Sequence, residues 1–275
     1  MRKLAGMKQH LGICYDQTSD FQQGQFNVLM GLVRETIPDR ALAAIRGMID
    51  IGAGTGARTL QSFSVFQSVQ RMTAIEPDRD MLTVARERYA DPRITYIQSV
   101  AEELSRLKIE GAPLDAVLSN WALHWVSDKQ MLMKDINALT KSGSYFVFST
   151  CEALPALLQM VDAYVRGEFR LDKVQSPFYY LNAQEWRGLL DKYGWDIRGI
   201  KAYTVGHEVP DTQKYLEHWF TASTAKFLYG RHLVELSSWA HSDLIWMMNR
   251  AFPSEKNPEG MLFTEDVMFV VAQRR

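Results

Sequence analysis

Residues 47–57 read GMIDIGAGTGA and are the most informative segment of the chain for its fold. A short apolar run enters three glycines at alternating positions, Gly52, Gly54 and Gly56, and helical periodicity follows them. Glycine permits positive φ and a close backbone approach, and a helix start offers N–H groups without intrahelical partners. The pattern predicts a strand–loop–helix unit that cradles a ligand. A tight turn that binds nothing is the alternative.

Working outward from this loop, short apolar runs alternate with helical segments as far as Thr150. The runs are residues 48–51, 72–75, 94–97, 116–118 and 145–148. Strands separated by helices need crossover connections, which predicts a mostly parallel sheet covered on both faces. Asp78, and either Ser127 or Asp128, are expected to cap the helices after the second and fourth runs.

The pattern changes after Thr150. The periodicity predicts helices within 154–165 and 182–193, then a strand over 195–205. An aromatic-rich helical region over 211–250 and a last strand over 261–273 follow.

We therefore expect an α/β fold: a Rossmann-like, seven-stranded, mostly parallel sheet with helices on both faces, an N-terminal helical arm and a C-terminal helical cap. The expected domains are an arm or lid (1–45), a ligand-binding core (46–150), and a segment (151–275) that completes the sheet and carries substrate-cap insertions. Such insertions usually lie over the carboxyl ends of the strands, where ligands bind.

The composition argues against several classes of function but does not identify the function. The 275 residues include 31 basic and 32 acidic side chains, a net charge of −1, which argues against nucleic-acid and anionic-membrane binding. No apolar run is long enough for a membrane span, and the start does not resemble a signal peptide. Two cysteines make neither a disulfide framework nor a zinc site, and no metal site is expected. These features predict a cytoplasmic protein.

The glycine loop fits two classes of ligand. Gly52, Gly54 and Ala57 also satisfy the dinucleotide pattern, and Glu76 stands about 20 residues on, where a carboxylate binds ribose hydroxyls. Asp50 separates the classes, because a carboxylate at the strand end would repel a pyrophosphate but suits an ammonium or sulfonium. This favours S-adenosylmethionine over NAD.

Three stretches carry a resemblance to a known family. Residues 50–56 resemble the first motif of the class I S-adenosylmethionine-dependent methyltransferases, Ile75–Asp78 the second, and Leu114–Trp125 the fourth. Together they cover about residues 45–150 in the family's order. Within the family, 120–125 and the late segment 210–219 look most like the trans-aconitate and malonyl-carrier-protein carboxyl methyltransferases.

The resemblance implies roles for single residues. The backbone of Gly52, Gly54 and Gly56 would border the methionine part, with Asp50 near its amino group or a bridging water. Glu76 would hold the ribose, and the main chain at Asn120 would accept from the ammonium.

The adenosine end is implied in the same way. Pro77 would flank the adenosine, and the backbone at Ala101 and Glu102 would meet the adenine edge. Val100 stands where the family often has an aspartate, so Ser99 or Glu102 would have to supply the acceptor. Tyr15 would belong to a lid over the methionine end, or would simply pack an amphipathic arm.

Methyl transfer from a sulfonium is an in-line displacement, for which positioning supplies most of the rate. A carboxylate nucleophile needs no base, whereas a phenol, amine or carbon acid would gain from one. His124 is the main candidate base, with packing between Trp121 and Trp125 as its alternative. His207 is a weaker candidate.

The predicted function is methyl transfer to a small molecule or carrier-bound acyl group, with carboxyl O-methylation favoured. O-, N- or C-methylation of a secondary metabolite with a histidine base, and a non-catalytic nucleotide-binding scaffold, stay open. The aromatic-rich cap would line a substrate chamber, with Arg170, Lys226 or Arg231 as candidates for an anion-binding residue.

Overall fold

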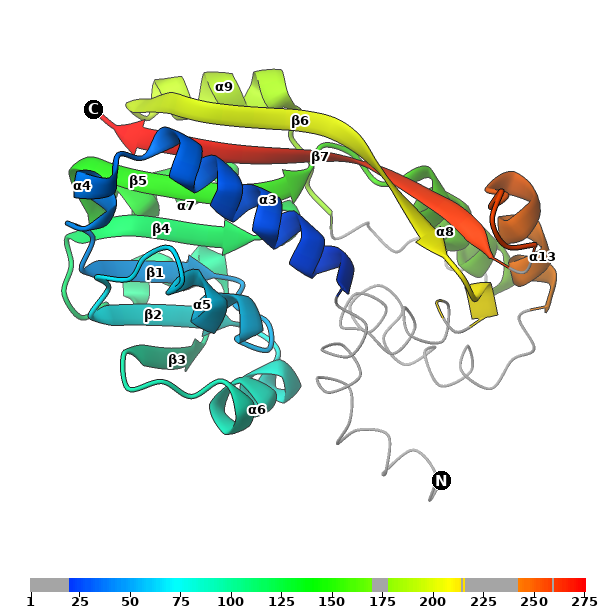
Figure 1. Ribbon diagram of the computed structural model, residues 1–275, viewed down its shortest axis with the longest axis horizontal. Helices are drawn as coiled ribbons and strands as arrows, with labels where there is room; N and C mark the ends of the chain where they lie inside the picture. The colour runs from blue at the N-terminus through cyan, green and yellow to red at the C-terminus, as the bar shows by residue number, and fades with distance from the viewer. Residues whose placement is uncertain (1–19, 170–177, 214, 216–241, 259) are drawn as a thin grey trace. The chain divides into compact units, whose positions relative to one another are not determined.

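The computed structural model describes residues 20–169, 178–213, 215, 242–258 and 260–275 (Figure 1). The strands are β1 (Gly47–Ile51), β2 (Arg71–Glu76), β3 (Ile94–Gln98), β4 (Leu114–Asn120), β5 (Thr140–Cys151), β6 (Trp195–Val209) and β7 (Met261–Arg274). They form one seven-stranded sheet in the order β3-β2-β1-β4-β5-β7-β6. The pairs β1–β2, β1–β4, β2–β3 and β4–β5 are parallel, and β7 runs antiparallel to β5. The predicted Rossmann-like, mostly parallel sheet is confirmed.

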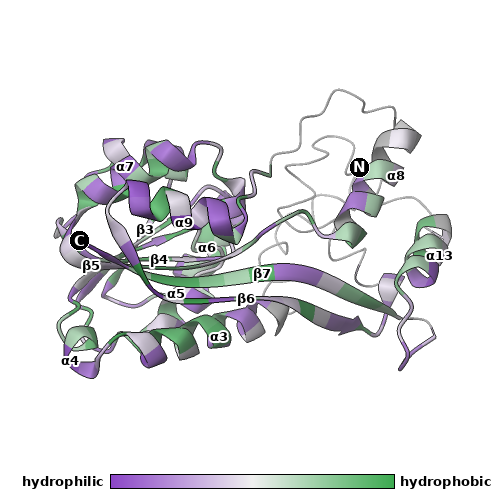
Figure 2. Ribbon diagram, turned by 90° about the horizontal axis from the view of Figure 1, so that it is seen from above, coloured by the Kyte–Doolittle hydropathy of each residue, from purple (hydrophilic) through white to green (hydrophobic). Residues whose placement is uncertain are grey.

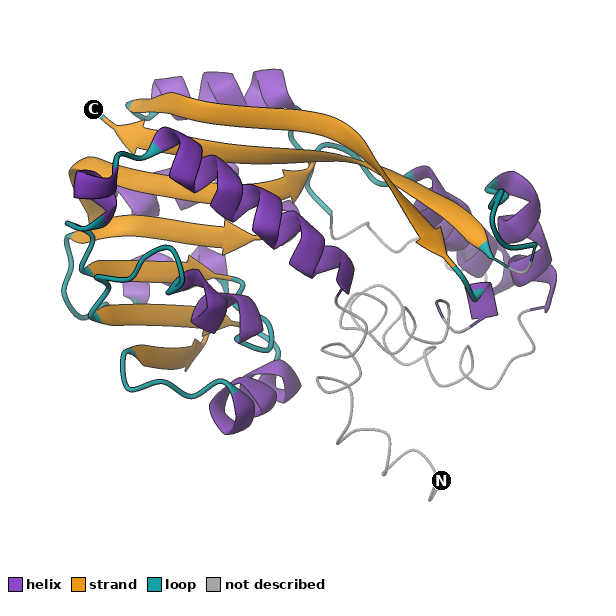
Figure 3. Cartoon of the chain, in the orientation of Figure 1, coloured by secondary structure: helices purple, strands orange, loops and turns teal. Residues whose placement is uncertain are grey.

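Helices cover both faces of this sheet, as predicted. The described helices are α3 (Asp20–Thr36), α4 (Asp39–Leu42), α5 (Ala57–Ser62), α6 (Arg79–Arg88), α7 (Lys129–Leu139), α8 (Ala156–Phe169), α9 (Ala183–Lys192) and α13 (Ser242–Ala251), with the 3-10 turns η1 (Ala101–Arg106) and η2 (Leu123–Trp125). Figures 2 and 3 show α3, α4 and α5 on one face and α7 and α9 on the other. None of the helices in the described part of the chain is both long and apolar enough to cross a membrane.

The described residues form two compact units. Unit 1 lies within Met1–Glu152, Tyr179–Ala202 and Val267–Arg275, and unit 2 within Ala153–Phe178 and Tyr203–Asp266. The three-part division predicted from the sequence stays a prediction.

The core of unit 1 explains why these apolar runs become central strands. Residues of β1, β4, β5 and β7 pack against α7 and α9, with Phe148 4.7 Å from the Trp186 ring and Phe146 4.6 Å from Phe148. On the opposite face, α3 buries Phe26, Leu29 and Val33. Burial on both faces is what a parallel sheet requires of its strands.

Local capping sets the helix starts as predicted. The Asp78 carboxylate accepts from the Asp80 N–H at 2.7 Å at the start of α6, and Asp128, not Ser127, accepts from the Met131 N–H at 2.8 Å at the start of α7. Helix α9 begins with a reciprocal capping box between Asn182 and Glu185. A cap satisfies N–H groups that have no partner inside the helix.

Several boundaries differ from the prediction. β5 runs over twelve residues rather than four, and β6 continues to Val209 instead of ending at 205. At the start of β5 the Lys141 ammonium lies 2.6 Å from the Asp115 carboxylate, and the Thr140 hydroxyl donates to the Ile136 carbonyl at 2.7 Å. Apolar periodicity does not report such polar contacts. Most of the helical region expected over 211–250 lies outside the described residues, which there include Thr212, Gln213, Tyr215 and α13.

Candidate active site

The glycine loop joins β1 to α5 through three left-handed residues. Gly52, Gly54 and Gly56 have φ of 80°, 57° and 82°. The N–H groups of Gly52 and Ala53 donate to the Ile75 carbonyl at 2.9 and 3.0 Å, which fastens the loop to β2.

Two of these glycines also leave no room for a side chain. A Cβ at Gly52 would overlap the Ala122 side chain, and one at Gly56 would overlap the Tyr96 hydroxyl. A Cβ at Gly54 would meet nothing within 4 Å. The backbone at Gly54 is therefore open to a ligand, while its two neighbours are packed against protein.

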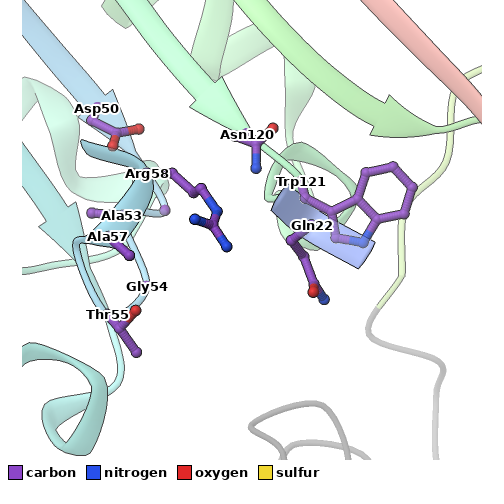
Figure 4. A pocket seen from close by; sticks show the side chains of 10 residues that line it. Gln22, Asp50, Ala53, Gly54, Thr55, Ala57, Arg58, Asn120 and Trp121 are labelled. Atoms are coloured by element: carbon purple, nitrogen blue, oxygen red, sulfur yellow. The ribbon is translucent and has the colours of Figure 1, made fainter. Parts of the chain in front are cut away.

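A hollow of about 440 Å³, part of it open to solvent, lies beside this loop (Figure 4). It is lined by Gln22, Asp50, Gly52, Ala53, Gly54, Thr55, Ala57, Arg58, Asn120 and Trp121. These residues come from α3, β1, the glycine loop, α5 and the end of β4. Four predicted cofactor residues, Asp50, Gly52, Gly54 and Asn120, thus meet in one place. Their contact with a cofactor stays a prediction.

Glu76 ends β2 and is held by the main chain. Its Oε2 accepts from the Gly54 N–H and its Oε1 from the Asp78 N–H, both at 2.9 Å. Burial raises the pKa of Glu76 to about 7, against the lowering effect of these two N–H groups. Each carboxylate oxygen keeps a further acceptor position, since each has two lone pairs. The group can therefore accept from two ribose hydroxyls without losing its backbone partners.

Asp50 is buried at the end of β1, inside the hollow. Its Oδ2 accepts from the Thr59 hydroxyl at 2.6 Å, and burial raises its pKa to about 7. A positive ligand nearby would favour the ionised form and lower that pKa. The position thus fits the predicted neighbour of an ammonium group.

The turn after β4 forms another wall. Trp121 has a φ of 61°, and its N–H donates to the Ser149 carbonyl at 3.0 Å. The Ser149 hydroxyl in turn donates to the Asn120 side-chain oxygen at 2.8 Å. A non-glycine residue in this backbone region is strained, and such residues concentrate at ligand sites.

The remaining predicted cofactor residues lie outside the hollow. Pro77 is exposed in the loop after β2, and Ala101 is buried at the start of η1. Glu102 is exposed, and its Oε1 accepts from the Ser127 N–H at 3.0 Å and the Ser127 hydroxyl at 3.1 Å. The two bonds from Ser127 use both lone pairs of Oε1, so a role as the adenine acceptor would fall to Oε2. The roles of Pro77, Ala101 and Glu102 stay predictions.

His124 is buried in an aromatic cage. Its ring lies 5.8 Å from Trp121, 5.6 Å from Trp125 and 6.0 Å from Tyr180, and Nδ1 lies 3.6 Å from the Cys151 sulfur. Burial, with a smaller effect of the Lys129 charge, lowers its pKa to about 3. A histidine this weakly basic is a poor general base near neutral pH, so the geometry favours the packing alternative. Its catalytic role stays untested.

The other histidine candidate lies in unit 2. His207 Nε2 lies 3.9 Å from the Glu265 Oε1. Burial lowers the pKa of His207 to about 4 and raises that of Glu265 to about 9. Between these values both groups are neutral, so they do not form an ion pair.

Two further predictions concern the substrate side. Tyr15, Arg170, Lys226, Arg231 and much of the aromatic cap lie outside the described residues. The structure also places Arg58 in the hollow, a residue that was not predicted from the sequence. Its position two residues after Gly56 was a usable signal, because the first turn of the helix after such a loop faces the ligand.

The residues present fit the predicted methyl donor. An open backbone at Gly54, a backbone-held carboxylate at Glu76 and a buried carboxyl at Asp50 suit a ribose beside a positively charged amino acid. Gln22 also has a buried side-chain oxygen that accepts no hydrogen bond from the described residues. It offers a further acceptor at the hollow.

Comparisons with known proteins agree with this chemistry. A family model described as a methyltransferase domain matches residues 49–148. A malonyl-[acyl-carrier protein] O-methyltransferase of Marinomonas sp. (strain MWYL1) is 29% identical over 99% of this chain and 94% of its own.

Solved structures show the same fold. The YcgJ protein of Bacillus subtilis superposes with a TM-score of 0.57 at 16% identity, over 90% of this chain and 99% of that one. Phosphoethanolamine N-methyltransferase 2 of Haemonchus contortus, solved with phosphomonomethylethanolamine and S-adenosylhomocysteine, has a TM-score of 0.52 at 20% identity, over 95% and 59%. The domain match, the sheet order and the glycine loop together support a class I S-adenosylmethionine-dependent methyltransferase.

Proposed function

We propose that the chain methylates a carboxylate, carried either by an acyl group on a carrier protein or by a small acid. The observation that carries the proposal is the similarity to a malonyl-[acyl-carrier protein] O-methyltransferase along 99% of this chain. The cytoplasmic location and the absence of a nucleic-acid or membrane partner, predicted from composition, belong to the same proposal.

The chemistry of the hollow supports a nucleophile that needs no base. Asp50 and Arg58 are the ionisable residues among the ten that line it. Asp50 already accepts from Thr59, and an arginine stays protonated. A carboxylate with an ordinary pKa near 4 is ionised at neutral pH and can attack directly.

When bound, the sulfonium supplies an electrophilic methyl carbon that a carboxylate oxygen takes in one displacement, which breaks the carbon–sulfur bond and releases no proton. This chain's residues orient the reactants. Glu76 and the glycine loop hold the donor side, and the turn at Asn120 and Trp121 forms the opposite wall. Orientation alone is worth up to about 7–11 kcal/mol in such reactions.

The test is methyl transfer from S-adenosylmethionine to malonyl-carrier protein, followed by mass spectrometry of the acyl group. We expect a methyl ester that mild base removes. A base-stable methyl group on oxygen, nitrogen or carbon of another substrate would favour the second hypothesis, of secondary-metabolite methylation with a histidine base. Tight binding of S-adenosylhomocysteine, with no transfer to any acyl or small-acid substrate, would favour the scaffold hypothesis.

A rate that follows a histidine pKa would also contradict the carboxylate proposal. The carboxylate mechanism predicts a kcat that is flat from about pH 6 to 8, because the nucleophile is ionised throughout. The pKa values of about 7 of Asp50 and Glu76 belong to the free enzyme and would affect kcat/KM instead. Replacing His124 with Asn tests the same point. If His124 only packs against its neighbours, the substitution lowers the stability of the protein and leaves the pH profile of kcat unchanged.

A further inference from the structure

Asn120 is the last residue of β4 and lines the hollow together with the glycine loop. Its side chain can offer a ligand either a hydrogen-bond acceptor or a donor, because an amide carries an oxygen on one side and an NH₂ group on the other. Which of the two faces the hollow decides what kind of chemical group Asn120 can bind there.

The Ser149 hydroxyl fixes the orientation of this amide. Ser149 lies beside Asn120 in the β4–β5 pair and is fully buried. Its Oγ accepts from the Trp121 N–H at 3.2 Å and donates to the Asn120 Oδ1 at 2.8 Å. If the amide were turned over, its NH₂ group would become a second donor to Oγ. The buried hydroxyl proton would then have no acceptor among the described residues, which is a costly arrangement.

The amide of Asn120 therefore turns its nitrogen toward the hollow. Figure 4 shows this nitrogen on the side of the open space and the oxygen turned away from it. Within the described part of the chain, Nδ2 donates to no protein acceptor. Gln22 offers the opposite group at the same hollow, a buried oxygen without a donor from the described residues. Asn120 is thus the neutral donor of the hollow, and its N–H groups can bind an acceptor on a ligand.

A carboxylate is the acceptor that suits this donor best. A hydrogen bond to an ionised acceptor is about twice as strong as one to a neutral acceptor. The amide does not titrate, so it can bind one carboxylate oxygen without giving it a proton and leave the other oxygen free to attack. An acyl group without a carboxylate would leave the N–H groups unpaired, which disfavours its binding.

We propose that the side-chain amide of Asn120 binds the carboxylate of the acid to be methylated and selects that acid over neutral acyl groups, with Ser149 as the positioning residue. The inference rests on the proposed function, because it takes the substrate to be an acid. A bond forms between a carboxylate oxygen and the methyl carbon, the carbon–sulfur bond breaks, and Asn120 keeps both its protons. After transfer the amide faces a neutral ester, whose oxygen is a weaker acceptor, so the product is bound less tightly than the acid.

Two substitutions of Asn120 test the donor. Asn120→Asp keeps an acceptor for the Ser149 hydroxyl and places an oxygen instead of N–H groups toward the hollow. Asn120→Ala removes the amide without adding a charge. Gln70→Glu is the matched control, because it makes the same amide-to-carboxylate change on an exposed residue just before β2, at the opposite end of the parallel strands. Thermal unfolding shows that each variant is folded before affinities are compared.

The measurement is calorimetry without turnover, on protein saturated with S-adenosylhomocysteine. The probes are malonyl-carrier protein and acetyl-carrier protein, of which only the first carries a free carboxylate. We expect the wild type and Q70E to bind the malonyl form at least about tenfold more tightly than the acetyl form. N120D and N120A should reduce this preference to about twofold or less, and should weaken S-adenosylhomocysteine binding by less than about twofold.

Ser149→Ala separates positioning from packing. If Ser149 acts through Asn120, S149A lowers the malonyl preference when Asn120 is present and causes no further loss in the N120A background. An equal loss of preference in both backgrounds would overturn the positioning role of Ser149.

A malonyl preference that survives in N120D and N120A would overturn the role of Asn120. A weaker S-adenosylhomocysteine affinity with an unchanged preference would also overturn it, because the amide would then contact the methyl donor. Equal binding of both acyl groups by the wild type would overturn it with or without methyl transfer. A wild type that prefers the malonyl form but transfers no methyl group would count against the proposed function alone, since the binding data would still decide on Asn120.

Discussion

Each compact unit buries carboxyl groups, and the two sets differ in what surrounds their oxygens. In unit 1, Asp50 accepts from Thr59, and Glu76 accepts from two backbone N–H groups. In unit 2, the Glu265 Oε1 is buried and accepts no hydrogen bond from the described residues. Donors favour the ionised form, so the pKa of both unit 1 acids rises only to about 7, whereas that of Glu265 rises to about 9.

Burial alone therefore does not make a binding site. Asp50 and Glu76 lie at the carboxyl ends of adjacent parallel strands, where loops supply N–H and hydroxyl donors. Glu265 lies within β7, and the facing His207 of β6 is neutral near pH 7. The first arrangement is ready to bind a ligand, and the second keeps its acid protonated.

The largest change in stability is expected from a substitution in the glycine loop, which lies beside Asp50 and Glu76. Replacing Gly52 with Ala should lower the free energy of unfolding by about 2–5 kcal/mol, from the left-handed backbone and the overlap with Ala122. Gly54→Ala is the control, since its Cβ meets nothing within 4 Å, and should cost only about 1–2 kcal/mol. Urea unfolding of the free protein measures both, and equal losses would show that contact with Ala122 does not matter.

The next largest effect is a change in ligand affinity, which tests whether the backbone-held carboxylate of Glu76 binds a ligand. Glu76→Ala should weaken S-adenosylhomocysteine binding by about 1–3 kcal/mol, because it removes the ribose acceptor and leaves the Gly54 and Asp78 N–H groups without it. Glu87→Ala, on the exposed face of α6, is the control. Calorimetry at constant pH gives the difference, and an unchanged affinity would remove the ribose assignment.

The third effect is a difference in pH dependence between the two units. A carboxyl whose folded pKa is raised binds more protons when folded, so the protein loses stability as pH rises from the unfolded pKa to the folded one. Glu265→Gln removes that loss, and its stability advantage should grow by about 1 kcal/mol from pH 7.5 to 8.5. Asp50→Asn should gain only about 0.1–0.2 kcal/mol over the same interval, because Asp50 is already largely ionised there.

Urea unfolding at both pH values tests this contrast. Parallel curves for the wild type and Glu265→Gln would mean that Glu265 is ionised in the folded state. The comparison between the units would then fail.

The smallest effect comes from an exposed neighbour of the unit 2 acid. Glu208 accepts from the Ser254 hydroxyl at 2.5 Å and lies 4.0 Å from the Lys256 ammonium. Since it is exposed, Glu208→Gln should change the free energy of unfolding by less than about 0.5 kcal/mol at any pH from 6 to 9. If the stability of this variant changed with pH, the pH dependence assigned to Glu265 would belong to β6 and β7 as a whole.

Local patterns were enough to predict the sheet-forming strands, the glycine turns and the caps at Asp78 and Asp128. Each depends on residues close in sequence, such as a carboxylate two or three positions before the N–H that it caps. The extent of β5 and the antiparallel insertion of β7 between β5 and β6 were not predictable in this way. Both depend on the pairing of β5 with β7, whose partner residues lie more than a hundred positions apart in the sequence.

The residues of the candidate site fall into the same two groups, those that the sequence predicts and those that depend on tertiary packing. The sequence alone placed Asp50, the glycines, Glu76 and Asn120 at strand ends, and parallel strands necessarily bring such ends to one edge. Tertiary packing decided that His124 is enclosed by aromatic rings, that Glu102 binds Ser127 and that Arg58 reaches into the hollow. Periodicity tells which residues share an edge or a face, but burial and charge at a side chain depend on neighbours that only the folded chain brings together.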